Sequence, residues 1–223
     1  MSNLGHGVIE KVLLFDDHRS SNKDIAISTT TVIGANWKAQ RAMRKDVIKK
    51  LEVDPMMRRS STIGTGFHMR AEQALHGDPM VTEQELYAER ELDGVWISGT
   101  FDLIYNNHIM DWKTSYGKAF SQEKINKAIL QMSIYRWLHP EIHIKNLAYT
   151  LFVSQSNNAY DSYPTEIMDV FDTEKYLKER IRAIKYQDKI DCHEGVKYNP
   201  CNYCEFSEQG CKDLVQANAG DFS

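Results

Sequence analysis

Residues 95–114 read VWISGTFDLIYNNHIMDWKT and carry the pattern of a β-hairpin. Apolar and polar side chains alternate over residues 95–104, as they do along a half-buried strand. Turn-forming residues at positions 105–108 then lead into a second strand-like segment at residues 109–114. The stretch therefore predicts two antiparallel strands at the centre of a sheet.

This hairpin carries three charged side chains at instructive positions. Asp102 lies in the first strand, and Asp111 and Lys113 share one face of the second because strand side chains repeat every second residue. Two carboxylates on adjacent strands can converge on one hard divalent cation such as Mg²⁺ or Mn²⁺. A lysine beside them can orient a water and stabilise charge on a phosphate under attack. Surface hairpins often carry similar charges, so a solvated face is the alternative interpretation of this pattern.

The composition is that of an ordinary globular protein. The chain has 223 residues, 42% of them hydrophobic and 26% charged, which is enough for one domain with a substantial core. Its net charge of -4 argues against a polycation that coats nucleic acid indiscriminately. We find neither a long uncharged apolar run nor a signal-peptide pattern, so we expect no membrane association and a cytoplasmic location, which is the host cytoplasm if a phage encodes the protein.

Charge is distributed unevenly along the chain. Residues 38–59 hold eight bases and three acids, whereas residues 72–102 hold eight acids and one base. These stretches fit a polyanion-binding face opposite a metal-binding acidic cleft, or simply two differently solvated surfaces.

Periodic segments on both sides of the hairpin predict the remaining elements. Apolar residues at helical spacing alternate along the chain with short β-rich runs, and this order predicts an α/β fold with a mixed sheet covered by helices. The predicted helices are residues 36–51, 61–76, 123–138 and 173–189, and the predicted further strands are residues 81–92 and 147–153.

Two of these helices carry polar pairs four residues apart. His68 and Glu72 share one helix face, and Gln131 and Tyr135 share another. Taken singly, each pair also fits a surface or core position without any chemical role.

Four motifs now stand in a definite order along the chain: Gly-x-x-x-His-x-x-x-Glu at residues 64–72, Gly-x-x-Asp at 99–102, Asp-x-Lys-Thr at 111–114 and Gln-x-x-x-Tyr at 131–135. This set resembles the RecB-type branch of the PD-(D/E)XK nuclease superfamily, which includes CRISPR-associated spacer-acquisition nucleases and phage recombination exonucleases. The resemblance covers about residues 28–211. It implies a restriction-endonuclease-like core over residues 1–190, with an N-terminal helical part, and a cysteine-rich staple over residues 191–223 packed on the same domain.

The resemblance also implies roles for individual residues. Asp102 and Asp111 would be metal-binding carboxylates of the catalytic site, Lys113 the catalytic lysine, and His68 a further ligand of Mg²⁺ or Mn²⁺. Phe101 occupies the position of the proline in the family's PD-(D/E)XK motif. This replacement removes no functional group.

Three more residues acquire roles by the same resemblance. Glu72 would serve a second metal or its waters, and Gln131 and Tyr135 would help to hold DNA near the scissile phosphate. The basic residues 38–59 are the best candidates for contacts with the DNA backbone.

The function that follows is metal-dependent hydrolysis of DNA, with an exonuclease favoured over an endonuclease. We expect a role in recombination, repair or phage DNA processing, with DNA as the substrate and a helicase or recombinase as a partner. The alternatives are a non-catalytic DNA-binding or scaffold subunit that retains the fold, and a small metal-stapled interaction protein.

All four cysteines lie near the C-terminus, at positions 192, 201, 204 and 211. The Cys201-x-x-Cys204 spacing with Cys211 is typical of metal ligation, and the nuclease branch often binds a four-iron cluster with such a trio. The upstream cysteine that completes that cluster is absent, and Trp37 stands in that region. We expect Cys192 to substitute as the fourth ligand. A 4Fe-4S cluster is favoured, with Zn²⁺ or unmetallated thiols as alternatives, in a structural role.

Overall fold

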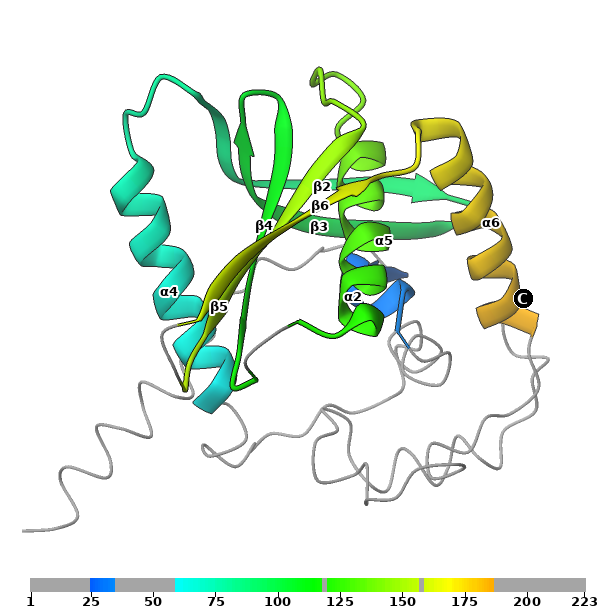
Figure 1. The fold of residues 1–223 in the computed structure, drawn as a ribbon. Helices are drawn as coiled ribbons and strands as arrows, with labels where there is room; N and C mark the ends of the chain where they lie inside the picture. Colours follow the sequence, from blue (N-terminus) through cyan, green and yellow to red (C-terminus); the bar gives the residue numbers. More distant parts are fainter. Residues whose placement is uncertain (1–24, 35–58, 118–119, 157–158, 187–223) are drawn as a thin grey trace, which may run out of the picture.

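The computed structural model describes residues 25–34, 59–117, 120–156 and 159–186 (Figure 1). The helix predicted at residues 36–51 and the cysteine-rich staple at 191–223 lie outside the described residues, as does most of the basic stretch at 38–59. The division of the chain into a core and a staple therefore stays a prediction.

The described elements follow the predicted order, with two additional strands and a short additional helix. They are β1 (Ala26–Ser28), α2 (Thr29–Val32), α4 (Arg59–Leu75), β2 (Val81–Leu92), β3 (Val95–Tyr105), β4 (His108–Ser115), α5 (Gln122–Leu138), β5 (Leu147–Ser154), β6 (Tyr160–Glu166) and α6 (Val170–Tyr186).

The sheet is mixed, as predicted. Its strands follow the order β1-β3-β4-β5-β6, and β2 pairs with β3 in addition. The β1–β3 and β4–β5 pairs are parallel, whereas the β2–β3, β3–β4 and β5–β6 pairs are antiparallel. Helices flank this sheet, with α5 running across its middle, α6 at one end and α4 at the other (Figure 1). The fold is the restriction-endonuclease-like α/β fold that the sequence predicts.

Two tight turns set the register of the three central strands. Asp93 and Gly94 both have positive φ, 50° and 75°, and place Leu92 opposite Val95 in the β2–β3 pair. Asn106 and Asn107 have φ of 48° and 61°, a backbone region that asparagine tolerates better than most residues. The predicted hairpin and both of its strands are confirmed.

The hydrophobic core lies between the sheet and the helices α5 and α6. Trp137 of α5 is fully buried, and its indole Nε1 donates to Glu174 of α6 at 3.2 Å. The guanidinium of Arg90 on β2 lies 4.4 Å from the Trp137 ring centroid and donates to the Trp137 carbonyl. Arg90 thus connects one end of β2 to the α5–α6 pair. The stacking of its cation on the aromatic ring is a favourable interaction.

The sequence pattern misses two strands for different reasons. The β1 strand has three residues, too few to show a period. The β6 strand is mostly exposed and contains Pro164. Proline usually argues against a strand, because it has no backbone N–H to donate. The β6 strand lies at the edge of the sheet, where a missing backbone N–H is tolerated. Among the described residues, no helix is long and apolar enough to cross a membrane.

Candidate active site

The predicted catalytic residues lie where β3 exchanges one neighbour for another. Along this edge β3 pairs with β1 at Trp96–Ser98 and with β4 at Leu103–Tyr105. The four residues between these pairings, 99–102, are the Gly-x-x-Asp motif, so β3 and β4 separate at the motif. The fork leaves the backbone N–H of Trp112 without a strand partner on β3. Asp102 Oδ2 accepts that N–H at 2.7 Å and so fixes its own carboxylate beside β4.

Asp111 and Lys113 form a buried ion pair on β4, beside this fork. Asp111 is 1% exposed, and the Lys113 ammonium donates to its Oδ1 at 2.9 Å. Lys113 Nζ also lies 2.8 Å from Oδ2, but outside hydrogen-bonding geometry, so that Asp111 Oδ2 is a buried oxygen with no hydrogen bond. The predicted sharing of one face by these two side chains is confirmed.

Burial and charge shift the ionisation of this pair. Burial raises the pKa of Asp111 to about 6, and the neighbouring Asp102 adds to the increase, although the charges of Lys113 and His68 oppose it. Burial alone would lower the pKa of Lys113, but the two carboxylates outweigh it and raise that pKa above its ordinary value. Lys113 is therefore a cation at neutral pH, and Asp111 is a carboxylate whose charge the metal-free site accommodates poorly.

His68 reaches the fork from α4. Its Nδ1 lies 3.4 Å from Asp102 Oδ1, so that the two oxygens of Asp102 point to different neighbours, one to α4 and the other to β4. Burial would lower the pKa of His68, but its hydrogen bond to Asp102 and the charge of that carboxylate raise it above the ordinary value. His68 of the helical motif thus lies next to Asp102 of the hairpin.

An aromatic contact links α4 to the sheet next to His68. The rings of Phe67 and Trp112 meet edge to face with centroids 5.4 Å apart. Other apolar residues of α4 are buried to different degrees: Ala71 and Leu75 are half-buried, whereas Ile63 is 40% exposed and Ala74 is exposed as well. The helix lies at one end of the sheet, and this contact is one of those that hold it there (Figure 1).

We expect Phe67→Ala to loosen α4 and to displace His68, its neighbour in sequence. Loss of the ring contact should cost about 1–2 kcal/mol of unfolding free energy and weaken the stabilisation of the protein by Mn²⁺ in thermal unfolding. Met69→Ala is the matched control, since Met69 follows His68 on the same helix but is 56% exposed. Equal effects of the two substitutions would show that the Phe67–Trp112 contact does not position His68.

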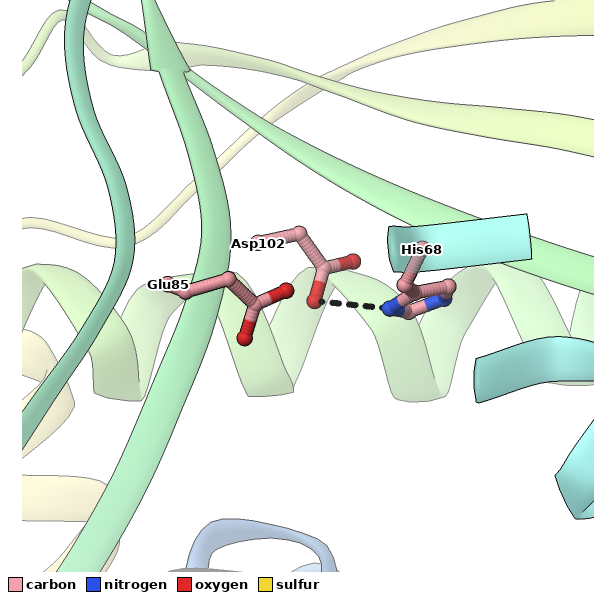
Figure 2. Close-up of side chains that lie close together, drawn as sticks. All are labelled: His68, Glu85 and Asp102. Atoms are coloured by element: carbon pink, nitrogen blue, oxygen red, sulfur yellow. Dashed lines mark ion pairs between the residues drawn. The ribbon is translucent and has the colours of Figure 1, made fainter. Parts of the chain in front are cut away.

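Glu85, which the sequence analysis did not single out, also lies at the fork. Glu85 of β2 falls opposite Asp102, because Gln84 pairs with Leu103 and Leu86 pairs with Phe101. Ligand atoms of His68, Glu85 and Asp102 all lie within 4.8 Å of one another, as Figure 2 shows. The Asp93-Gly94 turn was the signal that could have revealed Glu85, because pairing counted back from that turn places residue 85 opposite residue 102.

Glu72 does not belong to this group. It is exposed, as are most residues of α4 after His68, and its backbone carbonyl accepts the side-chain amide of Gln84 at 3.5 Å. The prediction that Glu72 serves a second metal is therefore not supported by its position. Residues four apart share a helix face, but His68 is half-buried whereas the Glu72 side chain is exposed.

Gln131 and Tyr135 lie in the interior, under the carboxylates. They are 7% and 5% exposed, and the amide of Gln131 donates to the Tyr135 hydroxyl at 2.5 Å. Burial raises the pKa of Tyr135 well above its ordinary value, and the charges of Asp111 and Asp102 raise it further. The phenol is therefore neutral and next to both acids. Direct contact with DNA, as the resemblance implies for these two residues, stays a prediction.

Gly99 provides the space for this phenol. A Cβ at position 99 would come within 2.8 Å of Tyr135 Cε1 and would overlap Thr29 Oγ1, which donates to the Ser98 carbonyl. The glycine of the Gly-x-x-Asp motif is thus required where Tyr135 and Thr29 pack against the open edge of β3.

The donor atoms at the fork are suited to a divalent cation. They comprise an imidazole nitrogen and carboxylate oxygens, which bind Mg²⁺ and Mn²⁺. The buried Asp111 Oδ2 accepts no hydrogen bond but lies 2.8 Å from the Lys113 ammonium, and it is a further anionic oxygen that a divalent cation could contact. The residues present therefore fit such an ion.

Comparison with known proteins agrees with this geometry. A sequence profile described as the PD-(D/E)XK nuclease superfamily matches residues 6–209. The chain belongs to the PD-(D/E)XK nuclease superfamily. The match includes the predicted active-site residues from His68 to Tyr135, and members of the superfamily use divalent metals. A search of curated protein sequences finds no significant match.

Two solved structures resemble this chain at low sequence identity. The crystal structure of SSO0001 has a TM-score of 0.57 and 17% identity, covering 80% of this chain and 85% of that one. A protein from Eubacterium rectale that is provisionally named an exonuclease has a TM-score of 0.46 and 11% identity, covering 80% and 91% of the two chains. At such identities the likeness of the first structure concerns the fold alone.

Proposed function

We propose that this chain is a metal-dependent deoxyribonuclease that hydrolyses phosphodiester bonds. The observation that carries the proposal is the meeting of His68, Asp102 and the buried Asp111–Lys113 pair at one fork in the sheet. The family to which the chain belongs and the donor set at the fork both support it.

The side chains would divide the work as follows. His68, Asp102 and Asp111 would hold Mg²⁺ or Mn²⁺, and the bound ion would supply Lewis acidity and a bound water of lowered pKa. Lys113 would donate hydrogen bonds to the attacking water or the phosphate as a cation, because its raised pKa keeps it protonated. Its ion pair with Asp111 holds the ammonium at the fork before substrate arrives.

Gln131 and Tyr135 would support this arrangement from beneath. The Tyr135 hydroxyl accepts from Gln131 and retains its own proton to donate to another acceptor. Preference for DNA ends rests on the resemblance of this Gln-x-x-x-Tyr motif to end-processing nucleases. A role in recombination, repair or phage DNA processing, a helicase or recombinase partner, and a metal cluster at the cysteines are further predictions of the sequence.

Cleavage assays with Lys113→Met test the proposal. Incubation of end-labelled linear DNA and closed circular DNA with Mn²⁺ should degrade the linear form faster if the protein is an exonuclease. Lys113→Met keeps the length of the side chain but removes the ammonium, and we expect cleavage to fall about 10²-fold or more.

The matched control is Lys127→Met, which removes an exposed lysine that pairs with Glu123 on α5. This variant should cleave like the wild type. Wild-type protein that leaves both DNA forms intact with Mg²⁺ and with Mn²⁺ would contradict the proposal and favour a non-catalytic DNA-binding subunit.

A further inference from the structure

A corner at residues 115–117, where the chain leaves β4, has a fixed backbone. The Ser115 carbonyl accepts the backbone N–H of Gln155 at 2.8 Å, and the Tyr116 carbonyl accepts the hydroxyl of Ser156. Both donors follow directly after β5, the strand that runs parallel to β4. The corner is therefore attached to the end of the neighbouring strand.

The side chain of Tyr116 has no such attachment. It is 49% exposed, and among the described residues none hydrogen-bonds its hydroxyl or stacks on its ring. An aromatic ring on a fixed backbone has few torsions left to order, so little conformational entropy is lost when a flat ligand stacks on it. Such rings serve as stacking platforms for nucleobases in proteins that bind single strands.

A lysine ammonium lies at the same corner. Lys124, in the first turn of α5, donates from Nζ to Ser115 Oγ at 3.3 Å, and this ammonium is 5.5 Å from the Phe120 ring centroid. The described residues place no carboxylate in an ion pair with it, whereas Lys127 on the same helix pairs with Glu123 at 2.8 Å. The charge of Lys124 is thus available to a phosphate.

The corner is adjacent to the proposed cleavage site. Tyr116 follows Lys113 by three residues, so their Cα atoms are at most about 11 Å apart. Ser115, which holds the Lys124 ammonium, shares a strand face with Asp111 and Lys113 because side chains repeat every second residue. The parallel strands β4 and β5 end together here, and ligands of α/β folds commonly bind at the carboxyl ends of strands.

We propose that Tyr116 and Lys124 bind an unpaired nucleotide next to the scissile phosphate. The base would stack on the Tyr116 ring, and its phosphate would contact the Lys124 ammonium. A base reaches a side chain in this way only outside a duplex, so the substrate class is DNA that is single-stranded at the point of cleavage. The inference rests on the proposed nuclease function for the identity of the ligand, but binding is measurable without cleavage.

Fluorescence anisotropy with a labelled single-stranded oligonucleotide and its duplex, without added Mg²⁺ or Mn²⁺, tests the stacking contact in the full-length protein. We expect Tyr116→Ala to weaken single-strand binding about fivefold or more and to leave duplex binding unchanged. Tyr116→Phe should bind like the wild type, because stacking requires the ring and not the hydroxyl. Phe171→Ala is the matched control, since Phe171 is an aromatic residue of α6 that is 78% exposed.

The salt dependence of single-strand binding tests the phosphate contact. Loss of one phosphate contact reduces the slope of log K against log salt concentration by about 0.7 for a single strand. We expect this change in Lys124→Gln and no change in Lys178→Gln, which alters an exposed lysine on α6. An unchanged slope in Lys124→Gln would show that the ammonium contacts no phosphate.

The outcomes separate the inference from the proposed function. Single-strand binding that Tyr116→Ala leaves unchanged, or that Tyr116→Phe weakens as much as Tyr116→Ala does, overturns the stacking site. Equal losses with single-stranded and duplex DNA overturn the unpaired nucleotide as the ligand. A wild type that cleaves no DNA with Mn²⁺ but binds single strands through the Tyr116 ring supports the inference and contradicts the nuclease.

Discussion

Replacing Asp111 by Asn is expected to lower the rate of DNA cleavage by about 10³-fold, because a metal ligand supplies several kcal/mol of transition-state stabilisation. The same change should make the metal-free protein more stable at neutral pH. Asn is isosteric with Asp and removes a buried charge that burial and Asp102 disfavour. Loss of activity would then accompany a gain in stability, as occurs when a site is strained for function.

The pH dependence has a definite sign. The pKa of Asp111 rises from an ordinary 3.8 to about 6 on folding, so the folded protein binds more protons than the unfolded chain between these values. The stabilisation by this proton is complete below the lower pKa and is lost as the pH rises through 6. A two-unit shift in pKa corresponds to roughly 3 kcal/mol of unfolding free energy. The stability gained by Asp111→Asn is smaller than this, because Lys113 loses one of its two carboxylate neighbours and keeps only Asp102.

Thermal unfolding of metal-free protein between pH 5 and pH 8 measures this effect. Wild type should become less stable relative to Asp111→Asn as the pH rises, with a difference of about 1–2 kcal/mol at pH 8, and Mn²⁺ should stabilise the wild type more. Asp161→Asn, an exposed position on the edge strand β6, should behave like the wild type throughout. A difference of opposite slope would mean that Lys113 stabilises the Asp111 charge more than burial disfavours it.

Gly99→Ala is expected to damage both the fold and the site. The added methyl group would come within 2.8 Å of Tyr135 Cε1 and would overlap the hydroxyl of buried Thr29. Overpacking of this kind costs about 1–3 kcal/mol, since neither neighbour is the end of a flexible side chain. Tyr135 would have to move away from Asp111 and Asp102, so cleavage should fall together with stability.

Chemical denaturation and the labelled-DNA assay check this result. Gly66→Ala is a control with the opposite expected sign, because Gly66 lies in the exposed part of α4, where an added methyl group would meet nothing within 4 Å. Alanine in a helix is favoured over glycine by about 1 kcal/mol, so this variant should be as stable as the wild type or more so. If Gly99→Ala changes neither stability nor cleavage, then the close approach of Tyr135 to β3 does not require a glycine at position 99.

Much of the site follows from local sequence alone. Alternation and the turn at residues 105–108 place Asp102, Asp111 and Lys113 on two adjoining strands, since strand side chains repeat every second residue whatever the rest of the chain does. Helical spacing likewise predicts the element that carries His68 and the one that carries Gln131 and Tyr135, with boundaries within a few residues of those found.

Other features depend on contacts between distant parts of the chain. The exposure of Glu72 and Ile63 follows from how α4 lies against the sheet. The spacing of apolar residues along a helix does not predict that arrangement. The fork between β3 and β4 exists because β1 and β4 occupy different parts of one edge of β3. The two strands that pair with this edge come from distant parts of the sequence. The residue pattern of β3 itself therefore cannot predict where the fork lies.

The sequence by itself determined the hairpin, the mixed α/β order and the identities of His68, Asp102, Asp111 and Lys113, because each depends on spacings of two to four residues. Only the tertiary structure decided that Glu85, and not Glu72, joins His68 and Asp102. The physical reason is that a side chain enters such a cluster through strand register, a left-handed backbone and the packing of a helix, which are properties of the assembled sheet.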